Sequence, residues 1–291
     1  MSIQRFEEFL TEGYYYGVEA ELVERVTSRY QLIEILKHEH LGKMLRIDGA
    51  LQCSEGDEFA YHEPLVHMVM ARTTEQAHVL IIGGGDGGAA EEALKWPQLA
   101  KLDQVELDAE VVDLACKHLR SIHHGLLEPN QTVDARFHLQ IGDGFKYIKQ
   151  LHQQGRKLNA LLLDLTDPGG PSLPLWNAEF FALCAQVLGD TGVLGLHVGA
   201  PWAQQQRCQQ VLDALRMSFP EVTPFLTHIP VSGGPWLMAV AAASNARPMP
   251  SQAALDDLLQ NLQPPRLKMV DGRVLHGMVD IAHHWTTSSQ R

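Results

Sequence analysis

The sequence predicts an α/β protein in which a doubly wound, largely parallel sheet follows a small antiparallel β-domain. Between residues 79 and 217, short apolar runs alternate with helix-forming stretches, a pattern typical of a parallel sheet covered by helices on both faces. Turn residues break the apolar pattern before this region, and the last two apolar runs have no helix between them. These three observations predict an N-terminal β-domain, a parallel sheet and an antiparallel closing hairpin.

The N-terminal region is predicted to be a set of short β-strands. Residues 1–20 show no clear period, but residues 22–51 hold strand-like apolar runs separated by turn residues. The Asp48-Gly49 pair between two such runs is a strong hairpin signal. We therefore expect an N-terminal β-hairpin domain over residues 1–62 and a larger α/β domain over residues 63–291.

The α/β domain is predicted from the regular alternation of its elements. Strands are expected over residues 79–82, 102–107, 136–141, 158–164 and 192–198, and helices over 89–95, 109–120, 144–154, 177–188 and 203–217. Two further strands, over 221–229 and 235–243, are joined by P-V-S-G-G-P without a helix, which predicts an antiparallel hairpin. By fold analogy, seven strands with a terminal hairpin indicate the Rossmann-like, methyltransferase-type sheet of S-adenosylmethionine-dependent transferases. A linker over 245–250 and a helix near 251–262 are expected to follow, with frayed residues at the C-terminus.

Composition and charge limit the classes of function. The 291 residues carry a formal net charge of −12, which disfavours nucleic acid as a partner, because nucleic acids bind basic surfaces. No apolar run approaches the roughly 20 residues that a membrane span needs. The N-terminus is not typical of a signal peptide, so a cytoplasmic location is expected. The scattered cysteines are interpreted as reduced thiols: Cys53, Cys116, Cys184 and Cys208.

A glycine-rich loop follows the first strand of the α/β domain. The segment from Val79 to Gly88 reads V-L-I-I-G-G-G-D-G-G, and glycines at the end of a strand let a nucleotide approach the main chain. The acid inside the loop, Asp86, would repel a pyrophosphate and attract a cation. The loop therefore predicts a cationic, phosphate-free nucleoside, and a nicotinamide dehydrogenase is disfavoured.

Further acidic residues fall where other strands end. Glu106 lies about 20 residues past the glycines, where an acid accepts hydrogen bonds from ribose hydroxyls. Asp108 is a candidate N-cap for the next helix. Asp143, in a G-D-G segment, is a candidate adenine contact, and helix capping is the alternative. Two carboxylates separated by three positions, Asp164 and Asp167, would raise each other's pKa unless a cation such as a protonated amine lay between them.

A polar segment between the two domains supplies candidate hydroxyl and imidazole groups. Tyr61 suits a hydroxyl role, whereas His62 taken alone would more often be structural. The histidine pairs of the chain lack the i, i+4 spacing and third ligand of a zinc site, so no metal is expected.

These motifs together resemble those of the spermidine synthases, the polyamine aminopropyltransferases. The resemblance covers most of the chain, from residue 28 to about 243. It depends on I-D-G-A-L-Q (47–52), D-E-F-A-Y-H-E (57–63), the glycine loop, E-L-D (106–108), G-D-G (142–144) and D-L-T-D-P-G-G-P (164–171). The order and spacing of the six segments are highly specific.

The resemblance implies a catalytic domain over 63–291 that transfers an aminopropyl group from decarboxylated S-adenosylmethionine to a polyamine, putrescine first, and releases methylthioadenosine. It implies no prosthetic group and a homodimer or homotetramer. Asp164 would be the base, assisted by Tyr61. The implied donor-binding residues are Gln52, His62, Gly83, Gly85, Asp86, Glu106, Asp143 and Gly144, and the implied acceptor-binding residues are Asp167, Tyr61 and Val231.

One segment departs from the family. The family usually has P-T-Y-P-S-G before the final strand, and its tyrosine lines the acceptor groove. Here residues 230–235 read P-V-S-G-G-P, so that Val231 or Ser232 replaces the tyrosine. Cadaverine, spermidine and agmatine therefore stay open as acceptors. An amine methyltransferase using S-adenosylmethionine and an inactive polyamine- or nucleoside-binding homologue are the alternative functions, and Asp86, Tyr61 and the Asp164–Asp167 pair disfavour them.

Overall fold

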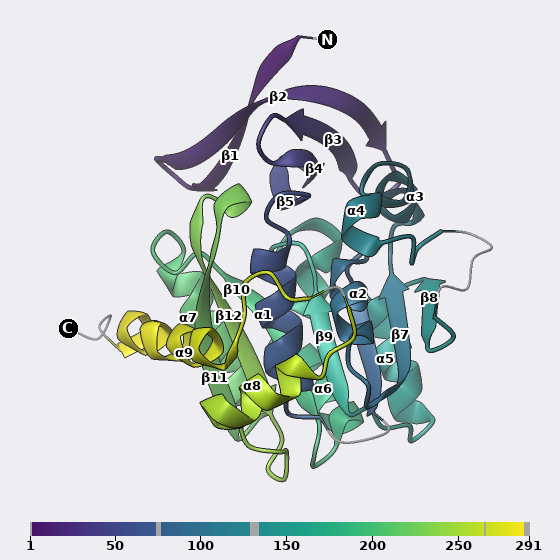
Figure 1. Cartoon of the computed structure of the whole chain (residues 1–291), viewed down its shortest axis with the longest axis vertical. Coiled ribbons are helices and arrows are strands. Elements are labelled where there is room, and N and C mark those ends of the chain that lie inside the picture. The colour runs from purple at the N-terminus through teal and green to yellow at the C-terminus, as the bar shows by residue number, and fades with distance from the viewer. Residues whose placement is uncertain (1, 74–76, 129–133, 265, 288–291) are drawn as a thin grey trace.

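The apolar run at residues 79–82 forms the middle of the central strand β6 (Ala77–Gly83), which is buried on both faces. In the computed structural model, which describes residues 2–73, 77–128, 134–264 and 266–287, this strand belongs to a seven-stranded sheet (Figure 1). The sheet order is β11-β12-β10-β9-β6-β7-β8. The other members are β7 (Leu99–Glu106), β8 (Phe137–Ile141), β9 (Ala160–Asp164), β10 (Val193–Gly199), β11 (Glu221–Ile229) and β12 (Gly234–Ala242).

The pairing of these strands confirms the predicted doubly wound sheet. Strands β10, β9, β6, β7 and β8 are parallel, whereas β12 pairs antiparallel with both β10 and β11. The chain leaves β6 toward β7 on one side and later returns to β9 on the other side. The strand order therefore reverses between β6 and β9, and ligands of open α/β sheets bind beyond the carboxyl ends of such a pair.

Helices cover both faces of the sheet. They are α1 (Phe59–Met70), α2 (Gly88–Leu94), α3 (Ala109–His118), α4 (Arg120–His123), α5 (Gly144–Gln153), α6 (Ala178–Leu188), α7 (Gln205–Arg216), α8 (Gln252–Gln260) and α9 (Gly272–Thr287), with 3₁₀ turns η1 (Gly170–Leu175) and η2 (Pro230–Ser232). Asp108 caps α3 by accepting from the Glu110 backbone N–H, as predicted. The side chain of Asp143 caps α5 in the same manner.

The N-terminal region is a separate five-stranded antiparallel sheet with the order β1-β2-β3-β4-β5. Its strands are β1 (Ile3–Thr11), β2 (Tyr14–Thr27), β3 (Leu32–His38), β4 (Gly42–Ile47) and β5 (Ala50–Ser54). Residues 1–20, where the sequence showed no clear period, form β1 and the first part of β2, which pair as a long hairpin. The predicted domain boundary after residue 62 lies within α1 and stays a prediction.

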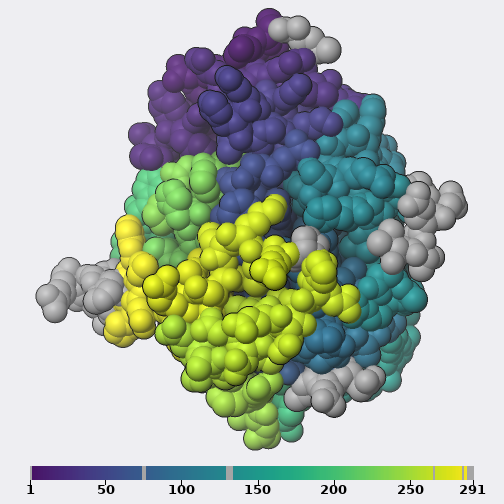
Figure 2. Space-filling model, in the orientation of Figure 1, coloured from purple at the N-terminus to yellow at the C-terminus, as the bar shows by residue number. Residues whose placement is uncertain are grey.

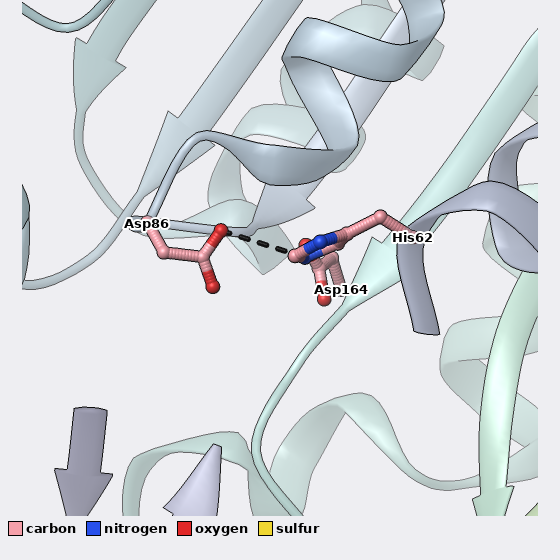
Figure 3. A group of neighbouring side chains, drawn as sticks. All are labelled: His62, Asp86 and Asp164. Atoms are coloured by element: carbon pink, nitrogen blue, oxygen red, sulfur yellow. Dashed lines mark ion pairs between the residues drawn. The ribbon is translucent and has the colours of Figure 1, made fainter. Parts of the chain in front are cut away.

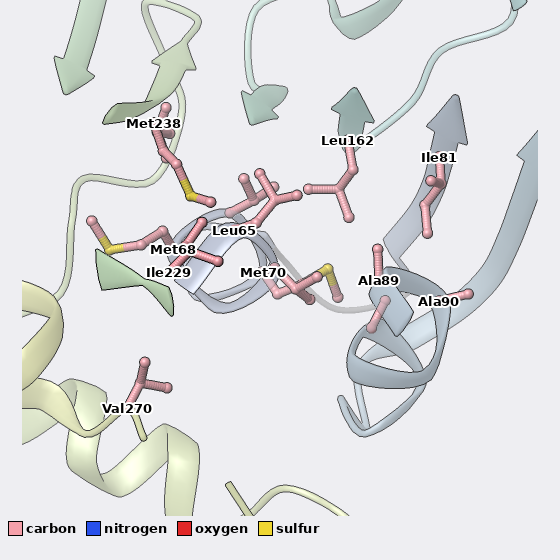
Figure 4. Packing of buried hydrophobic residues seen from close by; sticks show 14 of the residues in the cluster. Leu65, Met68, Met70, Ile81, Ala89, Ala90, Leu162, Ile229, Met238 and Val270 are labelled. Carbon is pink, nitrogen blue, oxygen red and sulfur yellow. The ribbon is translucent and has the colours of Figure 1, made fainter. Parts of the chain in front are cut away.

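Helix α1 is the centre of the larger hydrophobic core. Figure 4 shows Leu65, Met68 and Met70 of this helix among side chains from the sheet, such as Leu162, and from the C-terminal segment, such as Val270. The buried Glu63 carboxylate accepts hydrogen bonds from three successive backbone N–H groups, those of residues 268–270. This carboxylate therefore fixes the C-terminal segment across α1, because each buried N–H needs an acceptor.

The C-terminal segment was predicted only in part. Helix α8 confirms the helix expected near residues 251–262, but no helix was expected over α9. The two helices lie on the face toward the viewer in Figure 2, below the N-terminal sheet. Residues 286–287 of the segment predicted to be frayed are helical, and residues 288–291 lie outside the described part of the chain. Within the described ranges, no helix combines the length and apolar character that a membrane crossing requires.

Candidate active site

The cavity that collects the predicted site residues lies where β6 and β9 end. Gly83 is paired with Asp164 in the parallel register, and the Gly84 backbone N–H donates to the Asp164 backbone oxygen at 2.8 Å. The N-terminal sheet closes the cavity from above with Glu8, Gln31, Leu45, Ile47, Ala50, Leu51 and Gln52. The site therefore belongs to both parts of the chain, and the strand order explains its position.

Glycine is required in the loop because other segments approach its backbone closely. Gly83 has a φ of +85°, and a Cβ there would lie 2.1 Å from the Asp164 backbone oxygen. A Cβ on Gly88 would lie 2.2 Å from the His62 ring. Larger residues at either position would displace the catalytic candidates, since Cβ atoms do not approach other atoms so closely.

His62, Asp86 and Asp164 form a compact group at the base of the cavity (Figure 3). The His62 Nε2 atom lies 3.5 Å from Asp86, and Nδ1 lies 3.0 Å from Glu58. Burial alone would lower the pKa of His62, but Asp86 and Glu58 raise it to about 10. His62 is therefore an imidazolium at neutral pH.

The same three residues have ligand atoms within 4.8 Å of one another, close enough to surround a metal ion. An imidazolium has no free ring lone pair, and it already supplies a positive charge to the two carboxylates. The protonated ring thus fits the group better than a metal does, and the expected absence of a metal stays a prediction.

Asp164 combines an enclosed carboxylate oxygen with a raised pKa. Its Oδ2 atom is enclosed and has no hydrogen-bond partner. Burial and the charge of Asp86 raise the pKa of Asp164 to about 6, although His62 and Tyr61 oppose the rise. The Tyr61 phenol interacts with this carboxylate, and burial raises the tyrosine pKa well above its usual range. Tyr61 therefore remains a neutral hydroxyl that can orient Asp164.

Glu106 lies on the opposite side of the glycine loop and lines the cavity. One of its oxygens accepts from the Asp108 backbone N–H at 2.8 Å. Burial raises the Glu106 pKa to about 7. A carboxylate that lines the cavity can accept hydrogen bonds from the two hydroxyls of a ribose.

The remaining predicted donor residues differ in position. Gln52, Gly85 and Gly144 line the cavity, whereas Asp143 is not among its lining residues and instead caps α5. The structure thus brings Gln52 together with the glycine loop. The adenine contact predicted for Asp143 stays a prediction, and the capping alternative is observed.

At the acceptor end, Asp167 already has a cationic partner. Its Oδ2 atom accepts from Arg207 Nη1 at 2.9 Å, and its Oδ1 atom lies 3.7 Å from His197. Val231 is buried and is not among the cavity-lining residues, and its backbone N–H donates to Asp57. The next residue in the chain, Ser232, lines the cavity together with Trp236.

Four functional candidates were missed in the sequence: Glu8, His197, Arg207 and Trp236. Glu8 lies in the hairpin whose strands were not predicted, and Arg207 reaches the site from a helix 40 residues after Asp167. His197 lies near the carboxyl end of a predicted strand. The first and fourth predicted strands of the α/β domain are followed by candidate acids at the same end. A polar residue at the end of a strand was therefore the sequence signal that could have identified His197.

Comparisons with known proteins agree with this geometry. The family model of the spermine/spermidine synthase domain matches residues 58–250, and that of the spermidine synthase tetramerisation domain matches residues 6–55. A polyamine aminopropyltransferase of Nitrosomonas europaea is 34% identical over 269 residues, which cover 92% of this chain and 80% of that protein. The chain belongs to the spermine/spermidine synthase family.

Another relative and two solved structures are also similar to this member of the spermine/spermidine synthase family. The polyamine aminopropyltransferase of Clostridioides difficile is 34% identical over 74% of each chain. A crystal structure of spermidine synthase with the transition-state analogue AdoDATO superimposes with a TM-score of 0.82 at 23% identity, covering 97% of this chain and 94% of the other. The Thermotoga maritima spermidine synthase gives a TM-score of 0.81 with the same identity and coverage. Both superpositions show the common fold.

Proposed function

We propose that the protein is an aminopropyltransferase that moves the aminopropyl group of decarboxylated S-adenosylmethionine to a diamine and releases methylthioadenosine. The observation that carries the proposal is the cluster of Asp86, His62 and Asp164 at the carboxyl ends of β6 and β9. Family membership supports the same reaction. Putrescine is the first candidate acceptor, with spermidine as its product.

The chemistry requires a base and correct alignment. The amine nitrogen attacks the carbon beside the sulfonium, the carbon–sulfur bond breaks, and the electron pair leaves with a neutral thioether. An alkylamine is protonated at neutral pH, so a carboxylate must first take a proton from it. Asp164, with a pKa of about 6, is ionised at neutral pH and has an oxygen without a partner. Tyr61 would hold this carboxylate in position.

Asp86 would bind the ammonium of the donor's aminopropyl arm. Its Oδ1 atom accepts from the Gly88 backbone N–H and lies 3.5 Å from His62 Nε2, and the residue lines the cavity. Ordinary S-adenosylmethionine carries a carboxylate on this arm, which Asp86 and Asp164 would repel. Glu106 would bind the ribose, and the backbone of the glycine loop would contact the nucleoside.

The identity of the acceptor can be tested directly. The protein is incubated with decarboxylated S-adenosylmethionine and, separately, with putrescine, cadaverine, spermidine or agmatine, and products are followed by mass spectrometry. We expect methylthioadenosine and an equimolar amount of aminopropylated amine, with the fastest rate for putrescine. Methylthioadenosine without an aminopropylated amine, or no reaction with any amine, would contradict the proposed function.

The pH dependence of the reaction should follow Asp164. We expect kcat/KM for the acceptor to rise with pH through an apparent pKa near 6 and then level off, because protonated Asp164 cannot act as a base. The rise of kcat with pH should have a lower apparent pKa, since the cationic donor favours the ionised carboxylate. Initial rates between pH 4.5 and 8.5 provide both profiles.

Because Glu106 also has a raised pKa, a control variant must distinguish its titration from that of Asp164. The variant Glu106→Gln should keep the limb near pH 6 while its KM for the donor rises. If the limb disappeared in Glu106→Gln, or lay below pH 5 in the wild type, Asp164 would not be the group that titrates.

The N-terminal hairpin is the proposed interface of a homodimer or homotetramer. Ile3 and Phe9 expose 72% and 67% of their surface, and the segment matches a tetramerisation domain. We expect Phe9→Asp to reduce the mass measured by light scattering at least twofold, because a charge would be buried in the interface. Met217→Asp, at an exposed apolar residue of the α/β domain, should keep the wild-type mass. An unchanged mass for Phe9→Asp would refute this interface.

The predicted cytoplasmic location stays a prediction.

A further inference from the structure

Two residues in and beside the segment that departs from the family pattern form one wall of the cavity. Ser232 of η2 and Trp236 of β12 both line the cavity, and together they form the acceptor wall. The Trp236 Nε1 atom donates to His197 Nδ1 at 3.2 Å, and this Nδ1 atom lies 3.7 Å from Asp167 Oδ1. The acceptor wall therefore lies at the end of the cavity where Asp167 was expected to bind the acceptor.

Asp57, just before α1, holds the turn that carries the acceptor wall. Its Oδ2 atom accepts from the Val231 backbone N–H at 2.7 Å, and its Oδ1 atom accepts from the Ser54 hydroxyl at 2.6 Å. All three residues are buried. A buried N–H needs an acceptor, and a buried carboxylate is costly unless its oxygens are hydrogen-bonded. This arrangement meets both requirements, so that Asp57 connects η2 to the end of β5.

A second hydrogen bond joins the same two parts of the chain. The hydroxyl of Thr227, in β11, donates to the Ala60 backbone oxygen at 2.8 Å. Together with the bond between Asp57 and Val231, it attaches the chain before the acceptor wall to the residues that directly precede Tyr61. The wall and the Tyr61 hydroxyl are therefore held at a fixed separation, and the transfer requires such alignment of the acceptor with the catalytic groups.

The turn η2 also has little freedom on its other side. The Gly233 backbone N–H donates to the Pro230 oxygen at 3.1 Å and closes the turn. Gly233 has a φ of +78°, and a Cβ there would lie 2.7 Å from the Tyr16 ring. The turn is thus held between the Tyr16 ring of β2 and the Asp57 carboxylate.

We propose that Asp57 is a positioning residue that determines the selectivity for the acceptor by fixing the acceptor wall. The inference rests on the proposed function, since it concerns the acceptor of the proposed transfer. Asp57 is not among the cavity-lining residues, so it acts through Val231 and not by contact with the amine. Without its carboxylate, the Val231 N–H would lose its acceptor, and the wall would no longer fit one length of diamine.

The variant Asp57→Ala tests this role through the kinetics of the acceptor. We expect its KM for putrescine to rise about tenfold, the cost of one buried N–H without an acceptor. Its kcat should change much less, because Asp164, Tyr61 and the donor site stay in place. The preference between putrescine and cadaverine, measured as the ratio of kcat/KM, should shrink about fivefold, since a looser wall discriminates less well against one methylene.

The affinity for methylthioadenosine, measured by calorimetry, distinguishes positioning from general support of the fold. It should stay near the wild-type value in Asp57→Ala, because the nucleoside is expected at the glycine loop and Glu106. Comparable losses in acceptor KM, kcat and nucleoside affinity would show that Asp57 only supports the fold, and would overturn the proposal.

Two further variants separate the hydrogen bond from other effects. In Asp57→Asn, the amide oxygen can accept from the Val231 N–H while the amide nitrogen donates to the Ser54 hydroxyl, so KM for putrescine should return close to the wild-type value. If Asp57→Asn behaved like Asp57→Ala, the assigned role would be wrong. Asp256→Ala is the matched control, because it removes a carboxylate that accepts from the Gly272 N–H at 2.7 Å outside the cavity lining, and it should keep the wild-type KM.

The remaining outcomes distinguish this inference from the proposed function. Asp57→Ser, whose side chain is one atom shorter, serves as the second variant if Asp57→Ala does not fold, which thermal unfolding reports. If the wild type aminopropylates no amine, the proposed function fails. The role of Asp57 is then decided by calorimetric binding of putrescine with methylthioadenosine present, which Asp57→Ala should weaken. If transfer occurs and Asp57→Ala keeps the wild-type KM for putrescine, the reaction stands and the role of Asp57 fails.

Discussion

Replacing Asp164 with asparagine should lower kcat by about 10²–10⁴-fold, the usual contribution of a positioned general base. The amide cannot accept the proton of the acceptor's ammonium, so the reactive free amine would form only in solution. Asp164 has an enclosed oxygen without a partner and a pKa of about 6, which suit it to this task. The affinity for methylthioadenosine should change much less, because the ribose is expected at Glu106.

The measurement is a rate assay at neutral pH together with calorimetric binding of methylthioadenosine. Asp213→Asn provides a matched control, because it makes the same change on an exposed part of α7 and should keep the wild-type rate. A near-normal kcat for Asp164→Asn would show that another group accepts the proton.

Replacing Asp86 with asparagine should weaken the selection of the decarboxylated donor. A charge-assisted hydrogen bond to the donor's ammonium contributes about 1.5–3 kcal/mol, so we expect kcat/KM for this donor to fall roughly 10- to 100-fold. The value for ordinary S-adenosylmethionine should fall less, because its carboxylate would no longer meet Asp86. The ratio of the two values is the quantity to measure.

The same variant has a spectroscopic readout. Asp86 is among the groups that raise the His62 pKa to about 10, so Asp86→Asn should lower that pKa, as NMR titration of the imidazole can show. Asp86→Glu retains the charge and should keep the histidine protonated at neutral pH. An unchanged donor ratio in a variant whose His62 pKa has fallen would move donor selection to another residue.

The central part of the site could be predicted because its residues follow parallel strands. The carboxyl ends of β6 and β9 meet at one edge of the sheet, so Asp86 and Asp164 had to lie close together once both strands were recognised. The glycine pattern indicated how near the chain segments approach. The protonation of His62 was not predictable, because it depends on Glu58 and Asp86 together.

The contribution of the N-terminal hairpin to the site could not be predicted, because some of its exposed residues are apolar. In β1 the buried residues alternate as Phe6, Glu8 and Leu10, but Ile3 and Phe9 are apolar and exposed, and this obscures the period of two. An acid among the buried positions weakens the pattern further. Strand signals depend on a contrast between inward and outward residues, which this hairpin lacks.

The contact between Arg207 and Asp167 depends on tertiary structure alone. Asp167 lies in the loop after β9 and Arg207 in α7, with η1, α6 and β10 between them in the chain, and nothing in their local sequence links them. Helix α9 was not predicted, although Asp271 caps it by accepting from the Val274 backbone N–H, and the helix packs against β11 and α8.

The most direct test of the account is a competition between the two donors. The protein is given equal concentrations of decarboxylated and ordinary S-adenosylmethionine with putrescine, and the nucleoside products are quantified by mass spectrometry. We predict that methylthioadenosine forms together with an equal amount of spermidine, and that S-adenosylhomocysteine does not accumulate. Accumulation of S-adenosylhomocysteine with a methylated amine would contradict the account.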